Sequence, residues 1–176
     1  MQRMIDDLLV FTRTRLGGTL PVSFSPQDMG RICNDVADEV RASHPEARIA
    51  VTSSGELVGR WDGARICQLL VNLLVNAVQY GTGDISVNAL GQDDQVTVMV
   101  SNEGNPIPAR AMSTLFDPLT RESSPSRRSG SSSSMGLGLY ICRCIAFAHN
   151  GTIQVESSES STSFTLQIPR IPSTSC

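Results

Sequence analysis

Two kinds of hydrophobic periodicity alternate along the chain. Apolar residues recur at helical spacing in 1–16, 26–44, 63–80 and 135–149, and these four stretches are predicted to be helices. Short alternating or extended runs predict strands at 47–52, 57–61, 85–89, 96–100, 152–157 and 163–168. Helices and paired strands in this order predict an α+β fold, a two-layer α/β sandwich. We expect a mixed, mostly antiparallel sheet of about five strands packed on three helices.

Local signals predict where these helices begin and end. Ser25, followed by Pro26, is expected to cap the second helix, and Asp62 is expected to cap the third. Gly81 and Asn150-Gly151 suit the ends of the third and fourth helices, because these residue types accept the backbone conformation that follows a helix.

The first helix carries a narrow apolar seam of Met1, Met4 or Ile5, Leu8, and Phe11 or Thr12. A lone helix with such a seam is typical of one piece of a coiled coil or bundle. Packing on the rest of this domain is the alternative. We therefore divide the chain into residues 1–18, a domain at 19–170, and a tail at 171–176.

Composition narrows the possible functions. The 176 residues are 40% hydrophobic and carry a net charge of -3, which fits one globular domain and does not favour nucleic acid as a partner. The basic residues are all Arg, so mechanisms that need a Lys nucleophile or a P-loop Lys are excluded. The five Cys match no disulfide framework, which indicates reduced thiols in a cytosolic domain. No apolar run approaches the ~20 residues of a membrane span, so we expect no membrane contact by this segment.

A polar stripe runs along the third helix. Gln68, Asn72, Asn76 and Tyr80 are spaced four residues apart beside a strongly apolar face. Asn is a poor interior helix residue, so two amides one turn apart need an explanation. They are either a solvated face or oxygen ligands for a hard cation that also binds phosphates.

Two glycine pairs add to this picture. Asn102-x-Gly104 lies at a strand end, where Gly lets a ligand approach the backbone closely. Gly136-x-Gly138 opens the fourth helix after a polar, Ser-rich stretch at 119–134. Backbone N–H groups at a helix N-terminus favour phosphate. Each pair is a weak signal alone, and their order along the chain makes the combination specific.

In this order the motifs resemble the boxes of the ATP-binding catalytic domain of bacterial sensor histidine kinases, in the HATPase or GHKL superfamily. QLLVNLLVNAVQYG resembles the N box, SNEGNPIP the G1 box, LFDPLTR the F box, and MGLGLYICRCIAFAHNG the start of the G2 region. The resemblance covers residues from about 20 to 169 and implies the Bergerat ATP-binding fold. Residues 1–18 resemble the end of the second helix of a dimerisation and phosphoacceptor domain.

The resemblance implies roles for residues at both ends of an ATP molecule. Asn76 would bind Mg²⁺ through its amide oxygen, and Asn72 would support the metal or its waters. Tyr80 would line the ribose and adenine side. Asn102 would accept a hydrogen bond from the adenine amino group, and Gly104 would keep the adenine pocket open.

The remaining implied roles concern the adenine wall and the phosphates. Ile107 would be an apolar wall of the adenine pocket. The residues implied to donate backbone N–H groups to the phosphates are Gly136, Leu137 and Gly138. The γ-phosphate would be contacted by one of the arginines Arg121, Arg127 and Arg128, unless these form only a solvated basic loop.

Four positions depart from the family pattern or discriminate within it. Asn102 replaces the usual Asp but can accept the same hydrogen bond. Pro106 replaces the second glycine of the G1 box, as in some kinases linked to phytochrome-type modules. Gln79 replaces a Lys that many members carry near the phosphates. Relatives that hydrolyse ATP, such as gyrase B, carry Glu at position 72, and an Asn cannot serve as a general base, so hydrolysis should be slow.

The implied activity is transfer of the ATP γ-phosphate to a histidine on a dimerisation domain outside this chain, since His44 and His149 do not match the acceptor pattern. ATP and Mg²⁺ are the implied cofactors. The implied partners are the protein's own dimerisation and phosphoacceptor domain, a response regulator and a second copy of the full-length protein, and the implied location of this domain is the bacterial cytoplasm. The alternatives are a degenerate nucleotide- or partner-binding module without phosphotransfer and, less favoured by the helix at 1–16, a serine kinase of the anti-sigma type.

Overall fold

The computed structural model describes residues 2–118 and 137–171, with side chains described from residue 5 onward. The helices are α1 (Gln2–Arg15), α2 (Met29–Ser43), α3 (Gly63–Tyr80), α4 (Ala109–Met112) and α5 (Gly138–Ala148). The strands are β1 (Ser25–Asp28), β2 (Ile49–Ser54), β3 (Val58–Trp61), β4 (Ile85–Gly91), β5 (Gln95–Glu103), β6 (Thr152–Ser157) and β7 (Ser161–Pro169).

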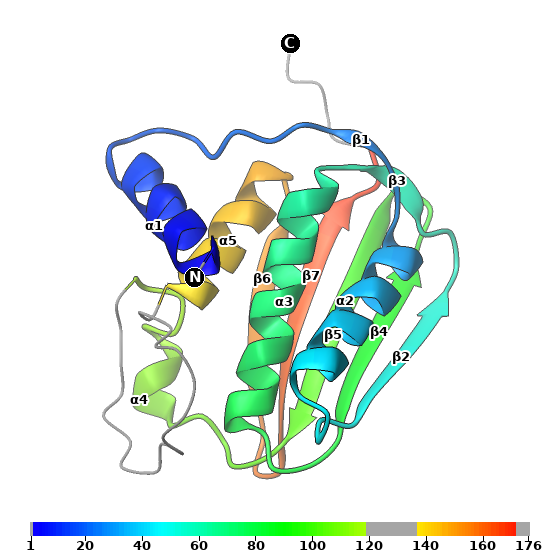
Figure 1. Ribbon diagram of the computed structural model, residues 1–176, viewed down its shortest axis with the longest axis vertical. Coiled ribbons are helices and arrows are strands. Elements are labelled where there is room, and N and C mark those ends of the chain that lie inside the picture. The colour runs from blue at the N-terminus through cyan, green and yellow to red at the C-terminus, as the bar shows by residue number, and fades with distance from the viewer. Residues whose placement is uncertain (1, 119–136, 172–176) are drawn as a thin grey trace.

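A five-stranded sheet forms one layer, in the order β2-β4-β5-β7-β6. The pair of β2 and β4 is parallel and the other three pairs are antiparallel. Helices α2, α3 and α5 form the second layer on one face of this sheet (Figure 1). The two-layer α+β sandwich predicted from the sequence is therefore confirmed.

Alternation along the strands places the core between the layers. In β5, Val96, Val98 and Val100 are buried, while the residues between them are half-buried on the opposite face. Val98 pairs with Ala89 of β4 and with Leu166 of β7, so apolar side chains form a continuous row beneath α3. The apolar face of α3 meets this row, and its members are all buried: Leu69, Leu70, Leu73, Leu74 and Ala77.

The start of α2 differs from the prediction. Ser25 and Pro26 lie in β1, which pairs with β3 in a separate two-stranded sheet. Asp28 is the cap instead, and its Oδ1 accepts the backbone N–H of Gly30 at 2.9 Å and of Arg31 at 3.3 Å. Proline is tolerated in an edge strand. Pairing with β3 therefore holds these residues extended, and the helix begins three residues later than expected.

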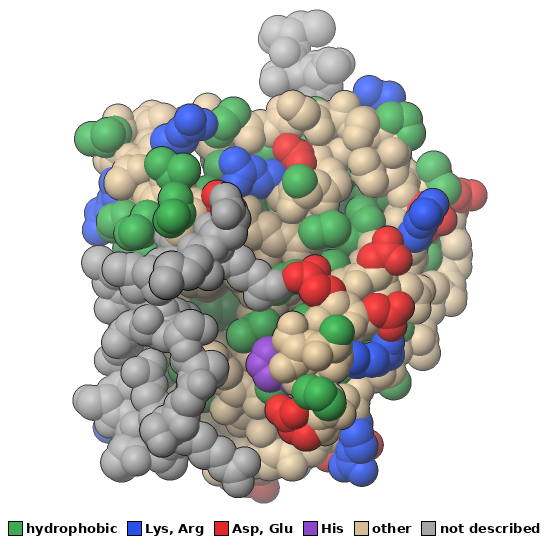
Figure 2. All heavy atoms as spheres, in the orientation of Figure 1, with side chains coloured by type: hydrophobic (Ala, Val, Ile, Leu, Met, Phe, Trp, Pro, Cys, Tyr) green, Lys and Arg blue, Asp and Glu red, His purple; other side chains and the backbone are tan. Residues whose placement is uncertain are grey.

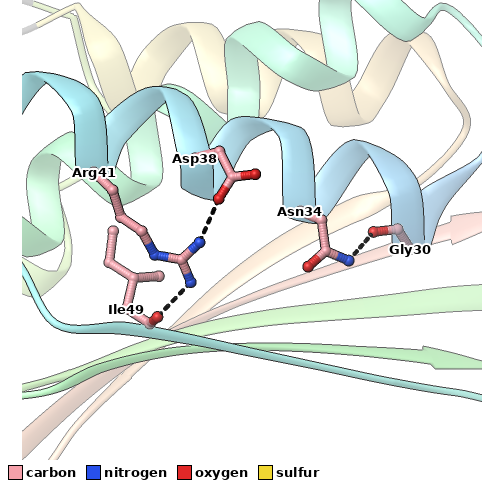
Figure 3. Close-up of polar contacts among 5 residues, drawn as sticks. All are labelled: Gly30, Asn34, Asp38, Arg41 and Ile49. Atoms are coloured by element: carbon pink, nitrogen blue, oxygen red, sulfur yellow. Dashed lines mark hydrogen bonds and ion pairs between the residues drawn. The ribbon is translucent and has the colours of Figure 1, made fainter.

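Polar contacts of α2 fix its C-terminal half to the sheet. The Arg41 guanidinium donates to the Asp38 carboxylate and to the backbone oxygen of Ile49, each at 2.6 Å (Figure 3). One turn from the start, the Asn34 amide donates to the backbone oxygen of Gly30 at 2.9 Å. Arg41 thus joins the end of α2 to the first residue of edge strand β2.

Helix α1 packs against α5, which is the second of the two arrangements considered for it (Figure 1). Phe11 and Thr14 make this contact through Tyr140, and Val10 is 2% exposed in the core. Ile5 and Leu9 are 56% and 54% exposed, so hydrophobic side chains remain on the surface over α1 (Figure 2). Of the predicted seam, Phe11 therefore packs on the domain, while Ile5 stays exposed.

Candidate functional site

Helices α3 and α5 run antiparallel and are joined by three polar contacts. In order along α3 these are Asp62 N–H to His149 Nε2 at 3.1 Å, the Cys142 thiol to the Leu69 oxygen at 3.5 Å, and Asn72 Nδ2 to the Gly138 oxygen at 3.3 Å. The last contact brings the polar stripe of α3 to the N-terminus of α5. Two of the three motifs singled out in the sequence therefore meet in space.

The polar stripe of α3 leaves the core gradually. Asn72 and Asn76 are half-buried, and Tyr80 is 63% exposed at the end of the helix. The half-buried positions can present amide oxygens to a ligand without losing their place on a packed helix. The role of Tyr80 beside a ribose or adenine stays a prediction, since its ring is largely exposed to solvent.

The described residues at the N-terminus of α5, Leu137 and Gly138, can offer a ligand backbone groups rather than side chains. The Leu137 side chain is 2% exposed and anchors the turn in the core, so only its backbone can serve a ligand. A Cβ built on Gly138 would meet the Asn72 amide at 3.9 Å, which is ordinary contact, so protein packing does not require glycine there. The first N–H groups of an α-helix have no partner within the helix. Gly136 and the three candidate arginines Arg121, Arg127 and Arg128 lie outside the described residues.

Asn102 lies at the end of β5 and is 7% exposed. Its Nδ2 donates to the backbone oxygen of Glu103 at 3.3 Å. Gly104 follows with a φ of +157°, and a Cβ there would lie 3.2 Å from the backbone oxygen of Tyr80. The third motif therefore packs directly against the C-terminal end of α3.

The segment after β5 covers the end of the closing hairpin. The backbone N–H of Ile107 donates to the Ser157 hydroxyl of β6 at 2.9 Å, and the Ile107 side chain is half-buried. Phe116 meets Phe164 of β7 edge to face, with ring centroids 6.2 Å apart. This segment is therefore held to the sheet on both sides of α4.

The thiols are not suited to act as nucleophiles. Burial raises the pKa of the Cys33 thiol to about 12 and raises the pKa of the Cys142 thiol as well. Both thiols are protonated at neutral pH, and Cys33, Cys67, Cys142 and Cys144 are all free. Cys33 and Cys142 act as packing residues, as their place in the core indicates.

Sequence reasoning did not find the contact between α1 and α5. The Tyr140 hydroxyl, in the first turn of α5, lies 2.7 Å from the Thr14 hydroxyl of α1. Tyr140 is separated by a single residue from Gly138, but nothing in its spacing links it to a threonine far away in the chain.

In the parts of the chain that the structure describes, no helix combines the length and apolar character that crossing a membrane requires.

The site lies within the region matched by a known family. The profile of the histidine kinase-, DNA gyrase B- and HSP90-like ATPases matches residues 61–172, and the chain belongs to this family. The fold and the site thus define an ATPase-like domain of the type found in histidine kinases.

Particular relatives narrow the class further. The chain is 36% identical over 171 residues to the probable sensor histidine kinase TcrY of Mycobacterium tuberculosis, covering 95% of this chain and 35% of TcrY. It is 29% identical over 171 residues to the bacteriophytochrome of Pseudomonas aeruginosa, covering 96% of this chain and 23% of that protein. The chain therefore spans about a third or less of these two relatives.

Solved structures agree with the sequence relatives. The catalytic domain of histidine kinase ThkA matches with a TM-score of 0.74 and 27% identity, covering 86% of this chain and 98% of that one. Full-length ShkA in complex with AMPPNP matches with a TM-score of 0.77 and 25% identity, covering 94% of this chain and 35% of that one. The predicted histidine kinase catalytic fold is confirmed.

Proposed function

We propose that this chain is the ATP-binding catalytic domain of a bacterial sensor histidine kinase, which transfers the γ-phosphate of ATP to a histidine on a dimerisation domain outside the chain. The observation that carries the proposal is the contact of Asn72 with the Gly138 backbone oxygen. It sets a half-buried polar helix face beside a helix N-terminus, which is the combination that a metal-bound polyphosphate needs.

The phosphates would be held by backbone groups at the start of α5. The N–H groups there point along the helix axis, and the helix dipole adds a partial positive charge. The chain has no Lys that could bind the phosphates, so the backbone N–H groups of Leu137 and Gly138 would make a larger share of the phosphate contacts. Gly136 and Arg121 are proposed to complete the phosphate contacts.

The chemistry of the donor set fits Mg²⁺. Asn76 presents a neutral amide oxygen, a hard ligand of the kind that Mg²⁺ accepts together with phosphate oxygens and water. A bound Mg²⁺ would neutralise charge on the phosphates during transfer. Asn72 lies one turn earlier, with its amide nitrogen engaged by Gly138, so its role is to hold α5 and to face the metal's waters with its oxygen.

The adenine would lie at the end of β5. Asn102 is buried enough there for its amide to discriminate a base by hydrogen bonding. Gly104 keeps the backbone close to α3, and Ile107 offers an apolar surface beside it. Tyr80 borders this end of the site from α3.

The phosphoacceptor is proposed to lie on another part of the parent protein. His149 is 0% exposed and both of its ring nitrogens are engaged within the domain. His44 is followed by a proline at a helix end, which is not an acceptor pattern. The same proposal includes a response regulator, a homodimer of the full-length protein and a cytoplasmic location for this domain. These parts concern the parent protein, because the chain spans only 35% of TcrY.

A nucleotide titration followed by transfer in trans tests this function. Purified chain should bind ADP or ATP in a Mg²⁺-dependent manner, and Asn76→Ala should abolish the Mg²⁺-dependent part without unfolding the domain. Asn34→Ala is the matched control, because Asn34 is a helical asparagine whose side-chain amide donates a hydrogen bond to the backbone of its own helix. Absence of nucleotide binding at millimolar concentration would contradict the proposal.

The alternative is a nucleotide-binding module that does not transfer phosphate. Gln79 and Asn102 favour it, because both replace residues that the family commonly uses at the nucleotide. Adding the parent protein's dimerisation domain with its histidine to the chain and labelled ATP discriminates the two. A phosphorylated dimerisation domain excludes the module, whereas binding without label transfer supports it.

A further inference from the structure

We propose that His149 is a positioning residue that holds α5 in register along α3, so that the phosphate-binding end of α5 stays opposite Asn72. This inference rests on the proposed nucleotide site. His149 itself touches no part of that site. It acts through α5, at whose opposite end Gly138 contacts Asn72.

The ring of His149 is fully engaged at the C-terminal end of α5. Its Nε2 accepts the backbone N–H of Asp62 at 3.1 Å, and its Nδ1 lies 2.8 Å from the backbone oxygen of Ile145. These partners assign one tautomer, with the proton on Nδ1 and a lone pair on Nε2. The edge of the Phe24 ring packs on it at a centroid distance of 5.4 Å.

The contact joins two rigid elements at their far ends. Asp62 directly precedes α3 and caps it, and His149 directly follows α5. An α-helix rises about 1.5 Å per residue, so the eleven residues of α5 transmit a displacement at His149 to Gly138 over about 16 Å. The contact of Asn72 with Gly138 is a single 3.3 Å hydrogen bond and does not fix this register alone.

Only the neutral imidazole can make this link. A protonated ring would bring a donor against the Asp62 N–H, and the 3.1 Å contact would become repulsive. Burial lowers the pKa of His149, while the Ile145 carbonyl and the Asp62 carboxylate act in the opposite direction. Asp62 is the charged group facing the ring, and its carboxylate already accepts the backbone N–H groups of Ser23 and Arg65.

The test compares how nucleotide affinity depends on pH in three proteins. The affinity of the unaltered chain for MgADP should fall only once the pH drops below the lowered pKa of His149, which lies below the value of about 6.5 for a free imidazole. His149→Gln should keep the affinity at pH 7.5 and lose this dependence, because its side-chain oxygen accepts the same N–H and does not titrate. His44→Gln should behave like the unaltered chain. Titration of the nucleotide phosphates is common to all three and cancels in the comparison.

A second variant separates positioning from folding. His149→Leu should weaken MgADP binding about tenfold at pH 7.5, because the half-buried Asp62 N–H loses its acceptor. It should also speed amide exchange at residues 141–143, the first hydrogen-bonded amides of α5, relative to His44→Leu. Lower thermal stability with unchanged affinity and unchanged exchange at 141–143 would overturn the proposal. If the unaltered chain binds no MgADP, the proposed function fails, and the exchange at 141–143 still decides the role of His149.

Discussion

The hydroxyl groups of Thr14 and Tyr140 lie 2.7 Å apart, across 126 positions of sequence. Phe11 meets the Tyr140 ring edge to face at 5.9 Å, and the Arg143 guanidinium lies 5.8 Å from the centre of that ring. Burial raises the pKa of the nearby Cys144 thiol, and hydrogen bonds with Tyr140 and Thr14 counteract that rise. Helix α1 is therefore joined to the first turn of α5, where phosphate binding is proposed.

The hydroxyl pair should contribute measurably to stability. Thr14→Val and Tyr140→Phe should each lower the free energy of unfolding by about 1 kcal/mol, because each removes the hydrogen bond between the two half-buried hydroxyl groups. The double variant should cost less than the sum, with a coupling of about 0.5 kcal/mol or more. Urea unfolding of the four proteins measures this. Tyr80→Phe, on an exposed tyrosine, is the control, and strictly additive losses would contradict the coupling.

The cap of α2 offers a sharp comparison between two nearby residues. Asp28→Ala should destabilise the domain by about 1 kcal/mol, because two backbone N–H groups at the start of α2 lose their acceptor. Ser25→Ala should change the free energy of unfolding by less than about 0.5 kcal/mol, since Ser25 is an exposed residue of β1. Chemical denaturation of both variants checks the order, and equal losses would contradict the cap assignment.

The stability of the domain should depend on pH through His149. Its pKa is lowered in the folded state, so the unfolded chain takes up a proton at a higher pH than the folded chain does. The free energy of unfolding should therefore fall as the pH decreases below about 6.5, by at most about 1.4 kcal/mol per pH unit. Denaturant unfolding between pH 5 and 7.5 measures the slope. His149→Gln should flatten it in this window, and an unchanged slope in that variant would exclude His149 as its source.

Much of the fold was readable because periodicity and burial agree. The recurrence of Val96, Val98 and Val100 at every second position predicted a strand with one face in the core, and the structure buries these three valines. The helix-initiation signals near residue 25 did not reveal that 25–28 pairs with 58–61, because strand pairing depends on distant residues. The sequence of α1 likewise did not show which of its faces meets α5, since that face is the one in contact with Tyr140.

The candidate site was predictable as residue types but not as an arrangement. Asn72, Asn102 and Gly138 were singled out because amides and glycines suit a metal-bound nucleotide. Their order along the chain supported a family resemblance, yet the hydrogen bond from Asn72 to Gly138 depends on how α3 and α5 pack. The role of His149 could not be predicted from the sequence for a related reason. A lone histidine at a helix end does not show which N–H group donates a hydrogen bond to its ring.

Two glycine substitutions should separate packing from ligand binding. Gly104→Ala should destabilise the fold by about 1 kcal/mol or more, since its φ is +157° and the new Cβ would lie 3.2 Å from the Tyr80 backbone oxygen. Gly138→Ala should leave stability unchanged or slightly higher, because the new Cβ would make ordinary contact at 3.9 Å and alanine favours a helix.

The same Gly138→Ala protein should bind MgADP about tenfold more weakly, a loss of about 1.4 kcal/mol, because a methyl group at the start of α5 keeps the phosphates from the backbone N–H groups. Calorimetric titration alongside thermal unfolding measures both effects in one preparation. Gly83→Ala is an unsuitable control, because its new Cβ would lie 2.2 Å from the Glu103 carboxylate. Gly17→Ala is also strained, because the φ of Gly17 is +82°, but its new Cβ would have no atom within 4 Å. Gly17 lies after α1, so this variant reports a backbone effect away from the site. Undiminished affinity in Gly138→Ala would move the phosphates away from the α5 N-terminus and contradict the proposed site.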